Sequence, residues 1–81
     1  MTSASTSAPV RVLFVCSGNI CRSPLAEAIF KSLAREAGLD SLFVVDSAGT
    51  HGFHEGDPAD PRTRRVGRKH GLDVDSIARP V

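Results

Sequence analysis

Two short apolar runs, separated by an amphipathic segment, dominate the first half of the chain. The run over residues 10–15 (VRVLFV) is almost continuous and rich in β-branched residues, which is typical of a strand covered on both faces. Residues 42–45 (LFVV) form a second run of strand character. The order strand, helix, strand predicts a right-handed βαβ unit with a parallel strand pair, and therefore an α/β fold.

The segment between the two runs carries apolar residues at helical spacing. Ser23 is a good N-cap, Pro24 suits the first helical position, and Gly38 stands where a left-handed C-cap belongs. One buried helix face is predicted from the apolar positions Leu25, Ala26, Ile29, Phe30, Leu33 and Ala37.

A polar segment with three glycines, residues 47–58, is predicted to be a long loop after the second strand. It leaves the same sheet edge as the loop that begins at Cys16, and open parallel sheets bind ligands at that edge. Asp60-Pro61 predicts the start of another helix, which runs to His70 and ends at Gly71. Residues 1–9 (MTSASTSAP) are expected to be a disordered tail before a domain portion over residues 10–81.

Composition narrows the classes of protein. The 81 residues, with 41% hydrophobic residues and a net charge of +1, allow one small domain and give no global attraction to nucleic acid or membrane. Two cysteines and no secretory signal favour a cytoplasmic setting. A solvated helix surface, rather than a nucleic-acid site, is the expected role of the basic residues Arg62, Arg64, Arg65, Arg68 and Lys69.

The segment from Cys16 to Ser23 (CSGNICRS) lies between a predicted strand and a predicted helix start. A loop this short turns consecutive backbone N–H groups inward, where they bind an anion together with the helix N-terminus. Gly18 and Asn19 tolerate the left-handed backbone that such a loop needs. Arg22 offers a planar pair of donors for two phosphate oxygens.

Cys16 lies at the base of this electropositive loop. A helix N-terminus and a nearby cation lower the pKa of a thiol, and the thiolate is the nucleophilic form. A hydrogen bond from Ser23 to the sulfur would favour the thiolate further. The pattern therefore predicts nucleophilic attack on a bound phosphoryl group and a phosphocysteine intermediate.

Residues 15–28 (VCSGNICRSPLAEA) closely resemble the signature of the low-molecular-weight protein tyrosine phosphatases. Weaker likeness continues through residues 46–50, 52–56 and 60–62, and runs from about Val10 to Val81. The resemblance implies a phosphotyrosine protein phosphatase I-like fold, with three layers around a central parallel sheet, of which this chain holds the first half.

The resemblance also implies roles. Cys16 is the nucleophile, and Arg22 binds the phosphoryl group and stabilises its transition state. The phosphate-binding loop consists of Ser17, Gly18, Asn19, Ile20, Cys21, Arg22 and Ser23. Asn19 holds the loop shape through Ser23 and Ser47, Cys21 forms a reversible disulfide with the nucleophile under oxidation, and Glu27 supports Arg22 or the loop.

Three features depart from the family pattern. Phe53 stands where the family usually has Trp at the substrate cleft, which His54 also borders. Ser76 stands where a histidine often supports the loop asparagine. The general-acid Asp-Pro of the family lies on a loop beyond Val81, and Asp57-Pro58 and Asp60-Pro61 align with a different family segment.

The expected function is hydrolysis of phosphotyrosine or of aryl phosphate monoesters, with inorganic phosphate as product and no cofactor. Two alternatives stay open: an arsenate reductase of the same fold, and a non-catalytic phosphate-binding remnant. No metal is expected, because Cys16, Cys21, His51 and His54 lack the usual zinc-finger spacing.

Overall fold

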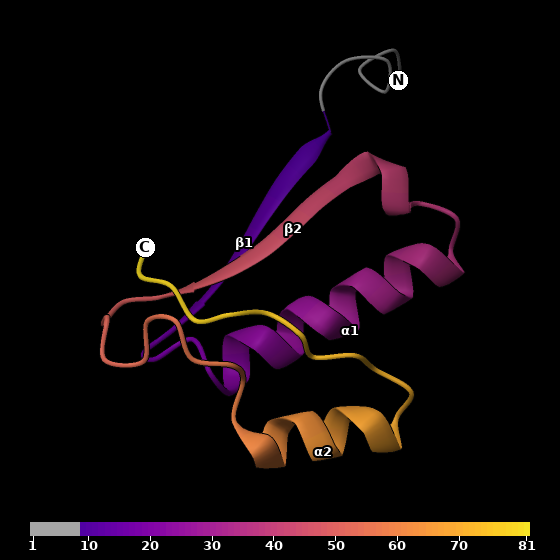
Figure 1. Cartoon of the computed structure of the whole chain (residues 1–81). Helices are drawn as coiled ribbons and strands as arrows, with labels where there is room; N and C mark the ends of the chain where they lie inside the picture. Colours follow the sequence, from indigo (N-terminus) through magenta and orange to yellow (C-terminus); the bar gives the residue numbers. More distant parts are fainter. Residues whose placement is uncertain (1–8) are drawn as a thin grey trace.

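The computed structural model describes residues 9–81, so the predicted tail lies outside the described residues except for Pro9. Strand β1 (Val10–Cys16) is followed by helix α1 (Arg22–Glu36), strand β2 (Phe43–Gly49) and helix α2 (Pro61–Lys69), as Figure 1 shows. The strands pair in parallel, in a register from Val10 opposite Phe43 to Cys16 opposite Gly49. The predicted α/β fold with a parallel strand pair is confirmed.

Helix α1 packs on one face of the two-stranded sheet. The ring of Phe30 lies 5.9 Å from that of Phe14 on β1 and 5.0 Å from that of Phe43 on β2, so it joins the three elements. Because side chains alternate along a strand, the neighbours Leu13 and Val44 point to the opposite face, and both are exposed.

The second strand is longer than predicted. Leu42 belongs to a 3-10 turn, Asp40–Leu42, and β2 extends through the polar and small residues up to Gly49. The expectation that residues 47–49 begin a loop was wrong, because pairing with β1 continues as far as Cys16 and outweighs their low strand propensity.

Helix α1 differs from its prediction in two respects. It begins at Arg22 without a side-chain cap, so Ser23 is a buried residue of the first turn rather than the N-cap. The predicted buried face is also partly wrong: Ile29 and Leu33 are 41% and 61% exposed, because the residues on the sheet side include Glu27.

The helix ends agree with the sequence signals. The carboxylate of Asp60 accepts a hydrogen bond from the backbone N–H of Arg62 and caps α2. Gly38 and Gly71 follow α1 and α2 with a φ of 73° each, the left-handed conformation expected of a glycine C-cap. Within residues 9–81, no helix has the length and apolar character needed to cross a bilayer.

Residues 77–81, hereafter the C-terminal segment, return from α2 to the carboxyl ends of the strands (Figure 1). The N–H of Gly49 donates to the carbonyl of Arg79, and the N–H of Val81 donates to the carbonyl of Gly49, both at 2.8 Å. Ala78 exchanges backbone hydrogen bonds with the 56–57 loop. The C-terminal segment thus joins the end of β2 to the loop that follows it.

Candidate active site

Cys16 is the last residue of β1, and the Cys16 loop (residues 16–22) leads directly into α1. Neighbouring segments hold the loop through its carbonyl oxygens. The backbone N–H groups of Thr50, His51 and Asp60 donate hydrogen bonds of 2.8–2.9 Å to the carbonyls of Cys16, Ser17 and Ile20, respectively. Since these carbonyls bond to flanking segments, the loop N–H groups remain for the interior of the loop.

The shape of the loop and its contact with β2 depend on Asn19 and on two glycines. Asn19 is buried and has a φ of 59°, which confirms the left-handed conformation expected there. Gly18 does not adopt a left-handed conformation, contrary to expectation; a Cβ there would lie 2.9 Å from the His54 ring. A Cβ on Gly49 would lie 2.7 Å from the carbonyl oxygen of Ser17, so the loop and the end of β2 need this glycine to approach each other.

The sulfur of Cys16 lies among hydrogen-bond donors. Ser23 Oγ is 3.1 Å from Sγ. Burial alone raises the pKa of the thiol, but hydrogen bonds from the Ser23 hydroxyl and from the backbone N–H groups of Ser23, Asn19 and Cys21 outweigh it and lower the pKa of Cys16 to about 7. A large share of Cys16 is therefore thiolate at neutral pH.

Asn19 is anchored through both ends of its carboxamide. Its Oδ1 accepts a 2.9 Å hydrogen bond from the backbone N–H of Arg79. Its Nδ2 donates to Ser23 Oγ at 2.8 Å and to Ser47 Oγ at 3.0 Å. Because a backbone N–H can only donate, Arg79 determines which end of the amide is the acceptor. Both amide protons are then used by the two serines.

Glu27 completes the assignment of the protons. Ser47 Oγ donates its single proton to Glu27 Oε1 at 2.6 Å, since a carboxylate only accepts. Ser47 must therefore accept from Asn19. Ser23 also accepts from Asn19, so its own proton points to the sulfur of Cys16. The hydrogen-bond directions are thus determined from Glu27 to the thiolate.

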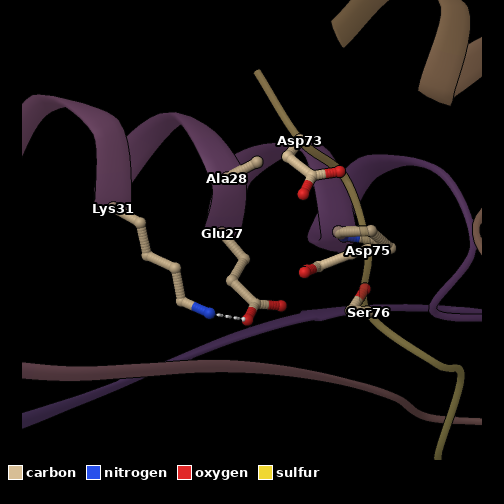
Figure 2. Close-up of a pocket in the computed structure, with 7 residues that line it drawn as sticks. Glu27, Ala28, Lys31, Asp73, Asp75 and Ser76 are labelled. Atoms are coloured by element: carbon tan, nitrogen blue, oxygen red, sulfur yellow. Dashed lines mark hydrogen bonds and ion pairs between the residues drawn. The ribbon is translucent and has the colours of Figure 1, made fainter. Parts of the chain in front are cut away.

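Glu27 itself is nearly buried, and Lys31 supplies its counter-charge. Lys31 Nζ lies 2.7 Å from Glu27 Oε2. Figure 2 shows this ion pair as a dashed line between the two side chains. The sequence predicted that Glu27 supports Arg22 or the loop. Among the described residues, the side chain of Glu27 bonds to Ser47 and Lys31, and through Ser47 it acts on the loop.

Ser76 lines a cavity of about 10 Å³ beside Glu27 (Figure 2). Its Oγ is buried and has no hydrogen-bond partner within residues 9–81. Asn19 receives its support from the backbone of Arg79, three residues further along, instead of from the side chain at position 76. The sequence carries no signal for this contact, because any residue except proline can supply the N–H.

Arg22 is exposed and forms no ion pair with a carboxylate of the described residues. Cys21 is a free thiol, as is Cys16. The guanidinium of Arg22 is therefore not neutralised by a neighbouring acidic group, which suits it to an anionic ligand.

The predicted cleft residues lie in the loop after β2. Phe53 is 83% exposed and stacks on His51, with ring centroids 5.3 Å apart and planes 6° apart. His54 lies against Gly18, and its Nδ1 is 3.4 Å from a carboxylate oxygen of Asp57. His51 was not predicted as the stacking partner of Phe53, and its position two residues before Phe53 is the signal for it in the sequence.

The carboxylates of the two Asp-Pro pairs, Asp57-Pro58 and Asp60-Pro61, interact with neighbouring residues of the chain. Hydrogen bonding from the backbone N–H of Arg62 lowers the pKa of Asp60 and binds its carboxylate to the start of α2. Asp57 lies beside His54. A general acid must be protonated near neutral pH, so a lowered pKa makes Asp60 unsuited to that role.

Comparison with known proteins gives a consistent result. The family described as low molecular weight phosphotyrosine protein phosphatase matches residues 11–81. A low molecular weight protein-tyrosine-phosphatase of Streptomyces coelicolor is 58% identical over 69 residues, which are 85% of this chain and 42% of that protein.

Solved structures agree. A protein tyrosine phosphatase from Entamoeba histolytica superimposes with a TM-score of 0.87 at 53% identity, over 89% of this chain and 46% of that one. A Drosophila arginine phosphatase superimposes with a TM-score of 0.82 at 40% identity, over 86% of this chain and 44% of that one. This chain spans about half the length of each of these three relatives.

Proposed function

This chain belongs to the low molecular weight phosphotyrosine protein phosphatase family, and we propose that its Cys16 loop binds the phosphoryl group of a phosphotyrosine protein or small aryl phosphate and transfers it to Cys16. The observation that carries the proposal is the hydrogen bonding that lowers the pKa of Cys16 to about 7. A thiolate surrounded by inward N–H groups at a helix N-terminus combines a nucleophile with an anion site.

The reaction has two steps. In the first, the Cys16 sulfur attacks phosphorus, the S–P bond forms, and the bond from phosphorus to the aryl oxygen breaks. The aryl oxide then takes a proton from a general acid or from water. In the second step, water attacks phosphorus, a new O–P bond forms and the S–P bond breaks, so that inorganic phosphate is released and the proton lost by water passes to solvent or to the phosphate. The hydrogen bond from Ser23 stabilises the departing thiolate.

Arg22 and the loop N–H groups hold the phosphoryl oxygens, whose negative charge is shared by three equatorial positions in the transition state. Ser17, Gly18, Asn19, Ile20, Cys21 and Ser23 contribute the backbone of this site. Phe53 and His54 border the aryl group, and Phe53 stacks on a phenol ring as it stacks on His51.

The general acid decides which substrates turn over. Asp57 and Asp60 have other roles, and the resemblance places the acid in a family segment after the portion matched here. Without a general acid, rates fall by about 10² to 10⁴. The fall is greatest for tyrosine, whose hydroxyl has a pKa of about 10, so the 81 residues alone favour activated aryl phosphates.

The setting proposed is the cytoplasm. Both cysteines are free thiols, and the mechanism needs Cys16 reduced. A reducing compartment keeps the nucleophile in that state.

The test is hydrolysis of p-nitrophenyl phosphate, a phosphotyrosine peptide and phosphoarginine by the 81-residue chain, with Cys16→Ser as control. We expect turnover of p-nitrophenyl phosphate above that of the peptide, and a phosphoryl group on Cys16 by mass spectrometry after acid quenching. Preference for phosphoarginine would assign the other activity found among the structural relatives. Arsenate-dependent thiol oxidation would indicate the reductase, and phosphate binding without any turnover would indicate a binding protein.

A further inference from the structure

Helix α2 concentrates the positive charge of the molecule. Its nine residues, Pro61–Lys69, carry five positive charges and no negative one. The chain as a whole has a net charge of +1, so the remaining residues carry a net charge of −4. Half of the ten lysines and arginines therefore lie on this one short helix.

Four of the five basic residues lie on the solvent side of α2. Gly67 marks the packed side, because it is buried and a Cβ there would lie 2.7 Å from the side chain of Val74. Successive helical residues are about 100° apart, so four basic side chains fall within an arc of about 120° that lies roughly opposite Gly67. We call these four exposed residues the basic face: Arg62, Arg65, Arg68 and Lys69.

Helix stability does not account for the basic face. Arg62 lies in the first turn, where the helix dipole disfavours a cation. Arg65 is three residues from Arg62 and from Arg68 and four from Lys69, spacings at which like charges repel. Within residues 9–81, Arg62 alone among the four has a carboxylate partner, Asp60 at 3.5 Å. Three positive charges are thus not neutralised by the described part of the chain.

The basic face begins beside the Cys16 loop. The backbone N–H of Asp60 donates a 2.8 Å hydrogen bond to the carbonyl of Ile20 in that loop, and α2 runs away from it (Figure 1). The helix rises about 10 Å from Arg62 to Lys69, a length that about three residues of extended peptide cover. A peptide with its phosphotyrosine in the Cys16 loop can therefore place neighbouring residues on the basic face.

We propose that the basic face binds acidic side chains of the phosphoprotein substrate, about three to six residues from the phosphotyrosine, and so selects substrates with acidic flanking sequences. This role rests on the proposed function, because the Cys16 loop holds the phosphotyrosine. The planar donors of an arginine match the two oxygens of a carboxylate.

The chemistry of α2 favours an acidic peptide over other polyanions. No residue of α2 is aromatic, so the helix offers no surface on which the bases of a single strand could stack. Its one long aliphatic side chain, Val66, lines a hollow with Leu25 and Ile29 of α1 and is not part of the basic face. A helix that binds a membrane surface needs an apolar face available to the lipid.

The test is calorimetric titration of the 81-residue chain with two peptides that carry a non-hydrolysable difluorophosphonate analogue of phosphotyrosine. One peptide has Glu at the third to sixth positions on both sides of the analogue, and the other has Gln there. At low salt the Glu peptide should bind about fivefold or more tightly, and the difference should shrink at about 0.5 M NaCl, because salt screens exposed charges.

The double variant Arg65→Gln/Arg68→Gln should lose most of this difference and keep the affinity of the chain for inorganic phosphate. The matched control is Arg35→Gln, which removes an exposed arginine from the last turn of α1, the end of that helix distant from the Cys16 loop. It should keep the preference for the Glu peptide.

Equal affinities of the two peptides for the wild-type chain would overturn the proposal, and so would a Glu preference that survives in the double variant. Tighter binding of an oligonucleotide or of anionic vesicles than of the Glu peptide, lost in the double variant, would assign the basic face to another polyanion and overturn it too. Inorganic phosphate reports on the Cys16 loop alone. Absence of phosphate binding would overturn the proposed function as well, whereas phosphate binding without a Glu preference would overturn only the role of the basic face.

Discussion

The backbone N–H of Arg79 donates a 2.9 Å hydrogen bond to Oδ1 of Asn19, and the two residues are 60 positions apart in the sequence. This bond orients the carboxamide that gives its two protons to Ser23 and Ser47. The shape of the Cys16 loop therefore depends on the position of the C-terminal segment. The guanidinium of Arg79 holds that segment through a 2.6 Å ion pair with Asp46 of β2.

Arg79→Met should weaken inorganic phosphate binding several-fold. The ion pair is about half exposed, so its loss costs little global stability, but it lets the C-terminal segment shift relative to Asn19. Isothermal titration with phosphate measures the effect. Arg79→Lys should restore most of the affinity, and Arg68→Met, a matched change on exposed α2, should leave it unchanged. Equal affinities for the Met variant and the wild-type chain would contradict this role.

Ser23→Ala should raise the pKa of Cys16 from about 7 toward the ordinary thiol value of about 8.5, because the thiolate loses a hydrogen-bond donor. The measurement is the rate of iodoacetamide reaction with Cys16 as a function of pH. The reaction rate of the wild-type chain should increase around pH 7, and that of the variant should increase at higher pH. Superimposable profiles would show that the Ser23 hydroxyl does not stabilise the thiolate.

The same shift changes stability with a defined sign. The folded state holds Cys16 at a lower pKa than the unfolded chain does, so thiolate formation stabilises the fold. The contribution is complete above the unfolded pKa and is lost as the pH falls through about 7. We expect the free energy of unfolding of the wild-type chain, relative to Ser23→Ala, to increase between pH 7 and about 8.5 in urea titrations. A constant difference over that range would falsify the assignment.

Much of the fold could be predicted from local signals. The strand character of residues 10–15, the Asp60 cap and the two left-handed glycines are short-range features, and the structure has them. The length of β2 could not be predicted, because Asp46–Gly49 is extended only by pairing with β1. The flank of α1 that is covered could not be predicted either, since an apolar pattern does not say which neighbour packs on it.

The site divides in the same way. Cys16, Arg22 and Ser23 could be selected as candidates because a strand, a turn-rich loop and a helix start are adjacent in the sequence. The contribution of Arg79 could not be predicted, because it is a backbone contact across 60 residues. Gly49 was predicted to lie in a loop. It is the last residue of β2, and a glycine is needed there because the Ser17 carbonyl comes too close for a Cβ, a contact that only the folded chain creates.

Gly49→Ala should destabilise the chain by about 1–3 kcal/mol and weaken phosphate binding. The new methyl group would lie 2.7 Å from the Ser17 carbonyl and 3.1 Å from the Asn19 nitrogen, so the loop or the end of β2 must move. Urea denaturation and phosphate titration measure the two effects. Gly52→Ala is the control, because its methyl group would find its nearest neighbour at 3.9 Å. Similar behaviour of the two variants would contradict the close-approach argument.

Glu27→Ala should raise the pKa of Cys16 although Glu27 does not touch the sulfur. Without its acceptor, the Ser47 hydroxyl can rotate and no longer holds one amide proton of Asn19, so the carboxamide that donates to Ser23 is held less firmly, by Arg79 alone. The buried Ser47 would also lose a partner, at a cost of about 1–3 kcal/mol in unfolding free energy.

Glu27→Gln separates the two effects, since its amide oxygen still accepts from Ser47 while the ion pair with Lys31 is lost. We expect the Gln variant and Lys31→Met to keep the wild-type pH profile of iodoacetamide reaction, and Glu27→Ala to shift it upward. A shift in all three variants would assign the effect to charge instead of to hydrogen-bond direction. No shift in Glu27→Ala would confine the role of Glu27 to stability, because Ser23 would then keep its orientation without the acceptor at the far end.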